Sequence, residues 1–437
     1  MRERLAGVMQ EGSRMGIDQV QAGGRVEKGF SVTARDSVNE SISYHEQVAA
    51  RISVYHQGRA GSVSTTDASK QGLKNALEKA VSLASFAEPD PDAGLPNDAD
   101  LAFDYPDCDL YHPWKLSPED AARIAIDIEK QALSLDSRCA VGDGAHVATY
   151  DTVSCLMNSK GFEGSYRRSD HSMGVNMLAK TTDEMKSDYA YTASRLSSEL
   201  RSSTDLASEV VKKVVGRLGA KPITSRSAPV VFSPEVALGF WGHLFNAMSG
   251  RRIHRQKSFL CKRLGQRLLR PGFVLQQQPH VTKQAGSMPY DFNGSKTEAT
   301  VFFDDGVFQT PMTSAYSARQ LGVPNTGNAS GIHHCVIPSD DLTLESMCER
   351  MGEGLLVMDV MGQGVDITTG DYSRGASGYW VSGGEIQHAV EGVTIASTLP
   401  EMLLGIQGLG SDRLTRSRVH AGSIWFNELV IGGADTN

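Results

Sequence analysis

The chain has 437 residues, which is long enough for two or three domains and a sizeable hydrophobic core. Hydrophobic residues make up 40% of the chain and charged residues 22%, as in an ordinary globular protein. A net charge of -8 and an isoelectric point near 5.9 argue against a protein that holds nucleic acid over its whole surface.

The N-terminal segment carries charges but no apolar core of signal-peptide length; it reads MRERLAGVMQEGSRMG. No later apolar run is long enough to span a bilayer. The six cysteines are scattered without a CxxC pair, and in a chain without an export signal we expect reduced thiols. These observations predict a cytoplasmic protein without a membrane partner.

The N-terminal half begins with strand and helix patterns. Residues 48–55 alternate apolar and polar side chains, which predicts a half-buried strand, and the turn after them returns the chain in a hairpin. A helix capped by Asp67 or Ser69 is predicted next. An acidic linker punctuated by prolines follows over residues 88–109.

Two further helices frame a β-rich segment. Ser117 and Pro118 open the first helix as its cap and first residue, and residues 204–219 form the second, which is amphipathic. Between them, residues 146–195 show the alternation that is typical of strands.

The helical pattern breaks at Lys221-Pro222, where we place the main domain boundary. Residues 1–221 then form an N-terminal domain with a sub-boundary near 88–112, and residues 222–437 form a C-terminal domain.

The C-terminal half opens with a short apolar strand, after which Ser233 caps a helix that has Pro234 in its first position. The side of this helix through Glu235, Gly239 and Gly242 is almost bare of side chains. Each glycine costs roughly 1 kcal/mol of helix stability relative to alanine. We therefore expect something to pack very close to this face.

A basic run without an intervening acid follows this helix. It could be a solvated surface, or it could bind phosphate or an acidic partner. Beyond it the chain is rich in strands and turns, with helices predicted near residues 342–350 and 400–406. The eight residues of the basic run are Arg251, Arg252, Arg255, Lys257, Lys262, Arg263, Arg267 and Arg270.

Glycine, hydroxyl and β-branched residues dominate residues 361–397. The second half predicts a hairpin that turns at Gly383-Gly384. The first half, residues 362–375, is a glycine-rich loop. It could be an anion cradle or the lip of a sheet that another backbone approaches closely. The loop matches neither GxxxxGK[ST] nor a GxGxxG that opens a helix, which argues against the anion cradle.

Histidines offer the remaining candidates for chemistry. His333 and His334 precede Cys335, but adjacent side chains on a strand point to opposite faces, so both imidazoles cannot easily reach one ion. His243 lies on an apolar stripe, as a hydrogen-bonded histidine at the margin of a core would. No GxSxG, CxxC or HExxH motif is present. Motifs alone therefore reveal no complete catalytic site.

Five longer segments, in this order, resemble the TldD/PmbA family, and most closely its PmbA branch, which is also called TldE. The resemblance covers nearly the whole chain. The segments are VYHQGRAGSVSTTD (54–67), PDPDAGLP (89–96), FWGHLFNAMSG (240–250), TSAYSARQLG (313–322) and MGQGVDITTGDYSRGASGYW (361–380).

The resemblance implies an α+β fold, with a mixed α/β N-terminal domain followed by a β-rich C-terminal domain that houses the site. It also implies one subunit of a cytoplasmic TldD–TldE heterodimeric peptidase. Such a complex processes or degrades unfolded proteins and peptides, including antibiotic-peptide maturation and antitoxin breakdown. In this family the TldD subunit carries the zinc on a helix with an HExxxH motif, and a cysteine near its C-terminus contributes.

The residues at the matching positions of this chain differ from that metal site. Pro234 and Gly239 replace the two histidines, Glu235 remains, and Ala421 stands where the cysteine would be. None of the three replacements has a side-chain donor for zinc. The resemblance thus implies a chain with no catalytic residue and no metal of its own, with zinc in the TldD partner.

Two other functions stay open. The chain could be a metallopeptidase that is active alone through ligands such as His243, His254 or the pair His333 and His334. It could instead be a regulatory protein whose basic run, residues 251–270, binds an acidic protein or nucleic acid. When isolated, the chain could also form a homodimer, because its usual partner would be a similar subunit.

The glycine-rich parts at 239–242 and 362–375 would let a substrate strand or the backbone of a partner approach closely. Asp371 and Arg374 are the predicted polar contacts of a peptide-binding cleft in the second of them. The full set of candidate substrate or partner contacts is Glu235, Gly239, Gly242, His243, Arg251, Arg252, Gly370, Asp371 and Arg374.

Overall fold

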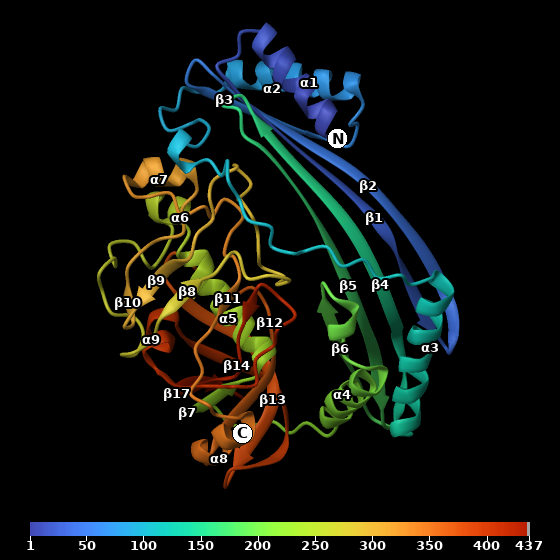
Figure 1. The fold of residues 1–437 in the computed structure, drawn as a ribbon. Helices are drawn as coiled ribbons and strands as arrows, with labels where there is room; N and C mark the ends of the chain where they lie inside the picture. Colours follow the sequence, from blue (N-terminus) through green and yellow to red (C-terminus); the bar gives the residue numbers. More distant parts are fainter. Residues whose placement is uncertain (435–437) are drawn as a thin grey trace.

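The structure, a computed structural model, describes residues 1–434. An arched sheet forms the N-terminal half, and a β-rich body formed by the C-terminal half lies on its concave side (Figure 1). The predicted fold class is confirmed, because helices and a sheet share the first half and strands dominate the second. The two halves of the chain thus face each other (Figure 1).

The N-terminal sheet has six strands in the order β3-β2-β1-β4-β5-β6, all antiparallel to their neighbours. The hairpin predicted from residue 48 onward is the end of β2 with β3. Only residues 50–56 of β2 pair with β3, so the earlier part of β2 is an open edge. The strands are β1 (Gln19–Arg35), β2 (Val38–His56), β3 (Arg59–Thr65), β4 (Cys139–Asn158), β5 (Glu163–Lys180) and β6 (Met185–Ser194).

Four helices cover one face of this sheet. Helices α1 (Arg2–Arg14) and α2 (Lys70–Phe86) pack at one end, and α3 (Pro118–Leu135) and α4 (Ser203–Gly216) pack at the other (Figure 1). The Ser69 and Ser117 hydroxyls accept hydrogen bonds from the Gly72 and Asp120 amides at 3.0 and 3.1 Å, so both serine caps are confirmed.

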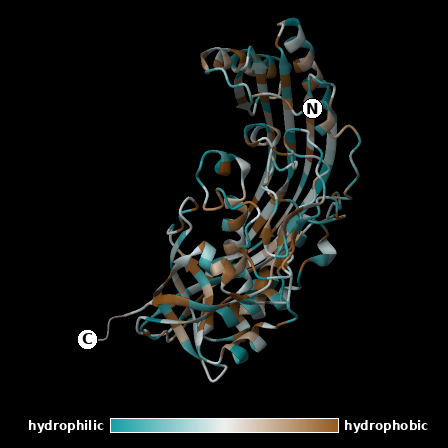
Figure 2. Cartoon of the chain, turned by 90° about the vertical axis from the view of Figure 1, so that its left-hand side faces the viewer, coloured by the Kyte–Doolittle hydropathy of each residue, from teal (hydrophilic) through white to brown (hydrophobic). Residues whose placement is uncertain are grey.

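The C-terminal body is built on six strands in the order β14-β13-β12-β7-β17-β15. An additional pairing of β14 with β17 closes a ring of five of them. Helix α5 (Pro234–Ala247) packs on this ring through Phe240 and Trp241, which are buried with the strand residues Phe232 and Phe426. Hydrophobic residues gather inside this body (Figure 2).

The remaining elements of the body surround this ring. The helices predicted near residues 342–350 and 400–406 are present as α8 and α9. The ring strands and β15 are β7 (Arg226–Phe232), β12 (Gly354–Met361), β13 (Asp371–Ser382), β14 (Glu385–Thr398), β15 (Ile406–Leu409) and β17 (Ile424–Gly432). A second sheet contains β8 (Leu275–Gln277), β9 (Thr300–Asp304), β10 (Val307–Phe308), β11 (Cys335–Val336) and β16 (Val419–His420). The shorter helices are α6 (Gly250–His254), α7 (Ala315–Leu321), α8 (Leu344–Met351) and α9 (Leu399–Leu404).

Helix α7 holds the predicted linker against the body (Figure 1). The Arg319 guanidinium donates to the carbonyl oxygens of Asp92, Gly94 and Leu95 at 2.7, 2.9 and 3.1 Å. The Tyr316 hydroxyl donates to the Asp90 carboxylate at 2.6 Å. Two segments that are far apart in the sequence therefore form one joint between the halves.

The start of α5 differs from the sequence-based prediction. Ser233 occupies the cap position, but its hydroxyl donates to the Met358 carbonyl at 3.5 Å and makes no hydrogen bond to the helix. Within residues 1–434 nothing packs closely on the glycine face, because a Cβ atom at Gly239 or Gly242 would meet no atom outside the helix backbone within 4 Å, and the expected approach of a substrate or partner backbone stays a prediction. This face of α5 is open.

The segment 361–398 follows the prediction more closely. The hairpin turns at Gly383 and Gly384, whose φ angles are 63° and 81°. A Cβ atom at Gly364 would lie 1.8 Å from the Ser373 carbonyl oxygen. This contact confirms the alternative of a loop that another backbone approaches closely.

No helix in the described part of the chain has the length and hydropathy needed to cross a bilayer. The domain boundary near residue 221 stays a prediction.

The glycines predict a contrast in stability. At Gly378, a Cβ atom would lie 1.9 Å from the Leu356 carbonyl oxygen, so Gly378→Ala should lower the free energy of unfolding by about 1–3 kcal/mol. Gly239→Ala, on the open face of α5, should raise it by up to about 1 kcal/mol. Urea denaturation followed by circular dichroism measures both. Equal midpoints for the two variants would contradict this description of the packing.

Candidate functional site

A cavity of about 430 Å³, the Glu235 cavity, lies between α4 and β6 of the N-terminal half and α5, β12, β13 and β14 of the body. Of the residues predicted from sequence, Glu235 and Arg374 line it. The other charged residues of its wall are Asp188, Lys213, Arg217, Asp359 and Glu391. The cavity therefore brings two residues predicted from sequence together with charged side chains that lie far from them in the chain.

Glu235, in the first turn of α5, makes ion pairs with two cations. Its Oε1 atom accepts from Lys213 Nζ at 3.1 Å and from Arg416 Nη2 at 3.2 Å. Lys213 belongs to α4 and also pairs with Glu209 at 2.8 Å. The Arg416 side chain is only 8% exposed, and its guanidinium lies 3.8 Å from the centre of the Tyr191 ring. Glu235 thus links the body to the N-terminal half.

Electrostatics keep this cluster ionised. Burial acts to lower the pKa of Lys213, but the charges of Glu235 and Glu209 outweigh it and leave this pKa raised. Burial acts in the opposite direction on Glu209, but hydrogen bonds from Lys213 and Arg201 outweigh it and leave the pKa of Glu209 lowered. At neutral pH the Glu235 carboxylate therefore faces two charged partners.

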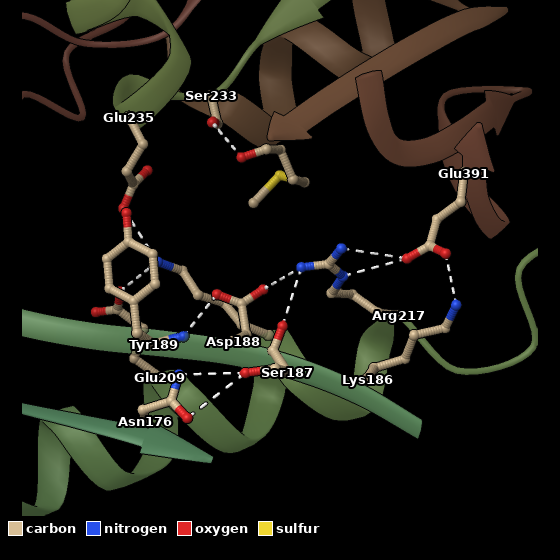
Figure 3. A network of polar contacts seen from close by, with 12 residues as sticks. Asn176, Lys186, Ser187, Asp188, Tyr189, Glu209, Arg217, Ser233, Glu235 and Glu391 are labelled. Carbon is tan, nitrogen blue, oxygen red and sulfur yellow. Dashed lines mark hydrogen bonds and ion pairs between the residues drawn. The ribbon is translucent and has the colours of Figure 1, made fainter. Parts of the chain in front are cut away.

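A second ion-pair group crosses the same cavity. Arg217 lies between Asp188 of β6 and Glu391 of β14, at 3.4 and 3.2 Å (Figure 3). Glu391 also accepts from Lys186 Nζ at 2.5 Å. Sequence reasoning missed these four residues, because no local pattern marks charged side chains that meet only through the tertiary fold.

Arg374 and His243 lie close together near this cavity. Arg374 donates to the Val360 carbonyl at 3.2 Å. The buried Nε2 atom of His243 has no hydrogen-bond partner, and the imidazole lies 6.2 Å from the Tyr372 ring, centre to centre. Burial and, to a smaller extent, Arg374 lower the pKa of His243. The structure thus places His243 beside an apolar ring and an arginine.

Asp371 and Arg374 do not line one cleft. They are three residues apart on β13, so their side chains point to opposite faces. The Asp371 carboxylate accepts from the Thr369 hydroxyl at 2.6 Å, outside the cavity. Gly370 is structural, because it has a φ of 91° and a Cβ atom there would lie 2.9 Å from the Pro400 ring.

The basic run is not one continuous surface. Arg267 pairs with Asp305 and Arg270 pairs with Asp340. The pKa of Asp366 is lowered by the Thr368 amide and, more weakly, by Arg252, which places Arg252 near the glycine loop. Arg251 lines a different cavity, on the concave face of the N-terminal sheet.

The paired histidines belong to the packed interior. His333 Nε2 lies 2.8 Å from the Gly327 carbonyl oxygen, and the His334 ring lies 4.7 Å from the His420 ring, centre to centre. His254 is exposed at the end of α6. Between residues 1 and 434, no three His, Cys, Asp or Glu side chains are grouped so that they could hold a metal.

Zinc ligation of the HExxxH type does not fit these residues. Pro234 and Gly239 lie on α5 at the positions of the two histidines, and Ala421 is fully buried. None offers a donor atom, and the retained carboxylate is paired with Lys213 and Arg416.

Comparisons with known families extend over most of the chain. Residues 25–84, 111–218 and 225–433 match domain 1, the central domain and the C-terminal domain of the PmbA/TldA metallopeptidases. The chain is 38% identical to metalloprotease PmbA of Escherichia coli O157:H7 over 405 residues, which are 93% of this chain and 90% of that protein. The chain belongs to the PmbA branch of the TldD/PmbA metallopeptidase family.

A second relative supports the same family, and two solved structures share the fold. A metalloprotease PmbA homolog of Haemophilus influenzae is 37% identical, with 93% of this chain and 90% of that protein covered. A putative modulator of DNA gyrase from Bacteroides thetaiotaomicron has the same fold, with a TM-score of 0.92, 22% identity and coverage of 99% and 98% of the two chains. TldE from Thermococcus kodakarensis matches with a TM-score of 0.86, 18% identity and coverage of 98% and 100%.

The Glu235 ion pairs predict a stability effect. Glu235→Gln should lower the free energy of unfolding by about 1–3 kcal/mol, because the buried Arg416 guanidinium would lose its carboxylate partner and Lys213 would keep only Glu209. Urea denaturation at neutral pH measures the change. Glu349→Gln on the exposed side of α8 is the matched control, and equal midpoints for the two variants would contradict the role of Glu235 as a link.

The buried histidines predict a pH dependence. Burial lowers the pKa of His333 and of His334 from 6.5 to about 4, and His420 adds to the effect on His334. Between these pH values the unfolded chain binds protons that the folded chain does not, so stability should fall as the pH is lowered from 6.5 to 4.

The double substitution His333→Gln and His334→Asn should flatten this pH dependence. Thermal melting of both proteins across this pH range provides the measurement. An identical pH dependence in the variant would show that other groups cause the loss.

Proposed function

We propose that this chain is a PmbA/TldE-type subunit of a cytoplasmic TldD/TldE zinc metallopeptidase complex, and that it has no zinc site of its own. With its TldD-type partner, it would process or degrade unfolded proteins and peptides, such as antibiotic-peptide precursors and antitoxins. Glu235 carries the proposal. In a metallopeptidase a glutamate at this helix position activates a metal-bound water, whereas here the carboxylate forms ion pairs with Lys213 and Arg416.

The open face of α5 supports a role as one wall of a shared chamber. Gly239 and Gly242 are exposed, and a Cβ atom at either position would meet nothing within 4 Å. A helix face without side chains lets another backbone come close, which suits a substrate strand or the surface of a partner subunit. We propose that this face contacts the TldD-type subunit or its substrate.

Reconstitution tests this function. The chain mixed with a TldD-type subunit should cleave an unfolded peptide faster than either protein alone, and the zinc should purify with the partner. Elemental analysis and peptide cleavage on each species are the measurements. A TldD-type subunit that cleaves equally well alone would rule out the role as a required subunit.

A steric substitution tests the open face. Gly242→Leu should reduce co-purification or cleavage by about tenfold or more, because a loss of about 1.4 kcal/mol in binding gives that factor. Lys79→Leu places the same side chain on an exposed position of α2 and should have no effect. Equal activity of the two complexes would remove α5 from the interface.

The other two functions give different results in the same experiments. Stoichiometric zinc in the isolated chain, removable by a chelator, would indicate a peptidase that is active alone. Binding to DNA or RNA that weakens steeply with salt and with charge reversal at Arg251, Arg252 and Arg255 would indicate a regulatory protein.

A further inference from the structure

A second cavity, the concave-face cavity, has a volume of about 870 Å³. Strands β1 to β5 contribute one wall, and α6, α7 and loops of the body contribute the other. Its volume lies in the upper part of the range of about 300–1,000 Å³ that is usual for ligand sites. Among the residues predicted from sequence, only Arg251 lines it.

The walls of this cavity carry four arginines: Arg25, Arg51, Arg168 and Arg251. Arg25 pairs with Glu27, and Arg168 pairs with Asp170 at 3.2 Å. Within residues 1–434, neither Arg51 on β2 nor Arg251 on α6 has an acidic side chain within 4.0 Å. Two unpaired cations therefore border one cavity from its two walls.

Asp291 is the one acidic residue of the cavity wall, and its carboxylate is already hydrogen-bonded to backbone amides. It is fully buried, and its oxygens accept from the backbone amides of Asn293, Ser295 and Ala329 at 2.8, 2.9 and 3.1 Å. Burial raises the pKa of Asp291 to about 6, which weakens its charge further near neutral pH. The cavity consequently has a positive excess.

Neutral hydrogen-bonding groups fill much of the remaining wall. Ser62, Ser64 and Ser154 lie on the sheet, and Asn293 lies on the body. Tyr290 also borders the cavity; it is 3% exposed, and its buried hydroxyl has no hydrogen-bond partner. An unpaired buried hydroxyl is costly unless a ligand or water completes it.

We propose that the concave-face cavity binds an acidic stretch of a peptide chain, with Arg51 and Arg251 each pairing with a side-chain carboxylate. Guanidinium groups bind carboxylates through two parallel hydrogen bonds, and serine and asparagine side chains can satisfy peptide N–H and C=O groups. The inference rests on the proposed function. It names the class of substrate peptide that this subunit would bind, at a site separate from the zinc of the TldD-type partner.

The packing of the Tyr290 ring favours a peptide over nucleic acid. Proteins that bind single strands stack bases on free aromatic faces. Here the Tyr290 ring is packed edge to face by Tyr105, Phe162 and Tyr166, with centre distances of 5.0, 5.1 and 5.6 Å. These rings serve the core and offer no free stacking face, whereas Phe292 on the cavity wall is 62% exposed and can contact an apolar side chain of a peptide.

Fluorescence anisotropy on the isolated full-length chain tests the proposal. The probe is a labelled peptide of alternating glutamate and serine, and its comparison is the same peptide with glutamine in place of glutamate. The acidic peptide should bind at least about tenfold more tightly, since one charge-assisted pair contributes about that factor.

The double variant Arg51→Gln and Arg251→Gln should lose this preference, and Arg51→Lys with Arg251→Lys should keep part of it. The double variant Arg14→Gln and Arg350→Gln removes the same net charge on α1 and α8 and should bind like the unchanged chain. Thermal melting confirms that each variant is folded, and the lysine variant remains informative if the glutamine variant does not fold.

Equal binding of both peptides, or full binding by the folded glutamine variant, would overturn the proposal. Tighter binding of a single-stranded oligonucleotide through the same two arginines would replace it with a nucleic-acid site. Because the assay needs neither zinc nor a TldD-type partner, its failure leaves the peptidase function standing. If the isolated chain binds the acidic peptide but the reconstituted complex shows no cleavage, the peptidase function is wrong and the peptide site stands.

Discussion

Ion pairs across one cavity hold the two halves together: Glu235 of the body pairs with Lys213 and Arg416, and Glu391 pairs with Lys186 and Arg217. The side chains of Glu235, Lys213 and Arg416 are largely withdrawn from water, and losing Glu235 would leave the buried Arg416 guanidinium without a carboxylate partner, whereas Lys213 would keep Glu209. This constraint explains how a glutamate can persist on a helix that lacks the flanking histidines. Under the proposed function, the side chain that would serve chemistry in a zinc-bearing subunit serves here as a connection between the two halves.

The halves are joined again at the other end of the arch, where Arg319 and Tyr316 hold the linker. Hydrogen bonds to the carbonyl groups of Asp92, Gly94 and Leu95 fix an extended segment that has little secondary structure of its own. With one joint near each end of the long sheet, the space between sheet and body keeps a defined width. Both cavities lie in that space, and the packing of Leu156 and Phe162 against Tyr290 adds a third contact between sheet and body.

The sequence predicted those features that interactions between neighbouring residues determine, such as helix caps and tight turns. The serine caps at Ser69 and Ser117 and the hairpin at Gly383-Gly384 were found because a few neighbouring residues specify them. Strand β1 and the first part of β2 were missed. The early part of β2 is mostly exposed on both faces and has no apolar alternation, so only its pairing with β1 makes it a strand.

Family resemblance located Glu235 and Arg374, but the partners of Glu235 could not be predicted. Lys213 and Arg416 reach it from other elements, and no spacing rule connects such positions. The same holds for Arg51 and Arg251, which border one cavity only because the body folds back onto the sheet. The separation of Asp371 from Arg374 could have been read from the sequence, because the two residues are three apart on β13 and their side chains therefore point to opposite faces.

The strand order β3-β2-β1-β4-β5-β6 has a consequence for how the molecule assembles. The pairs β1–β2 and β4–β5 are hairpins between adjacent strands, whereas β1 and β4 meet across α2, the linker and α3. Closing that seam carries the largest loop entropy in the sheet, so the two sub-sheets should form first and dock later. Since the linker is clamped by α7, the N-terminal half reaches its final form only after much of the C-terminal half has been synthesised.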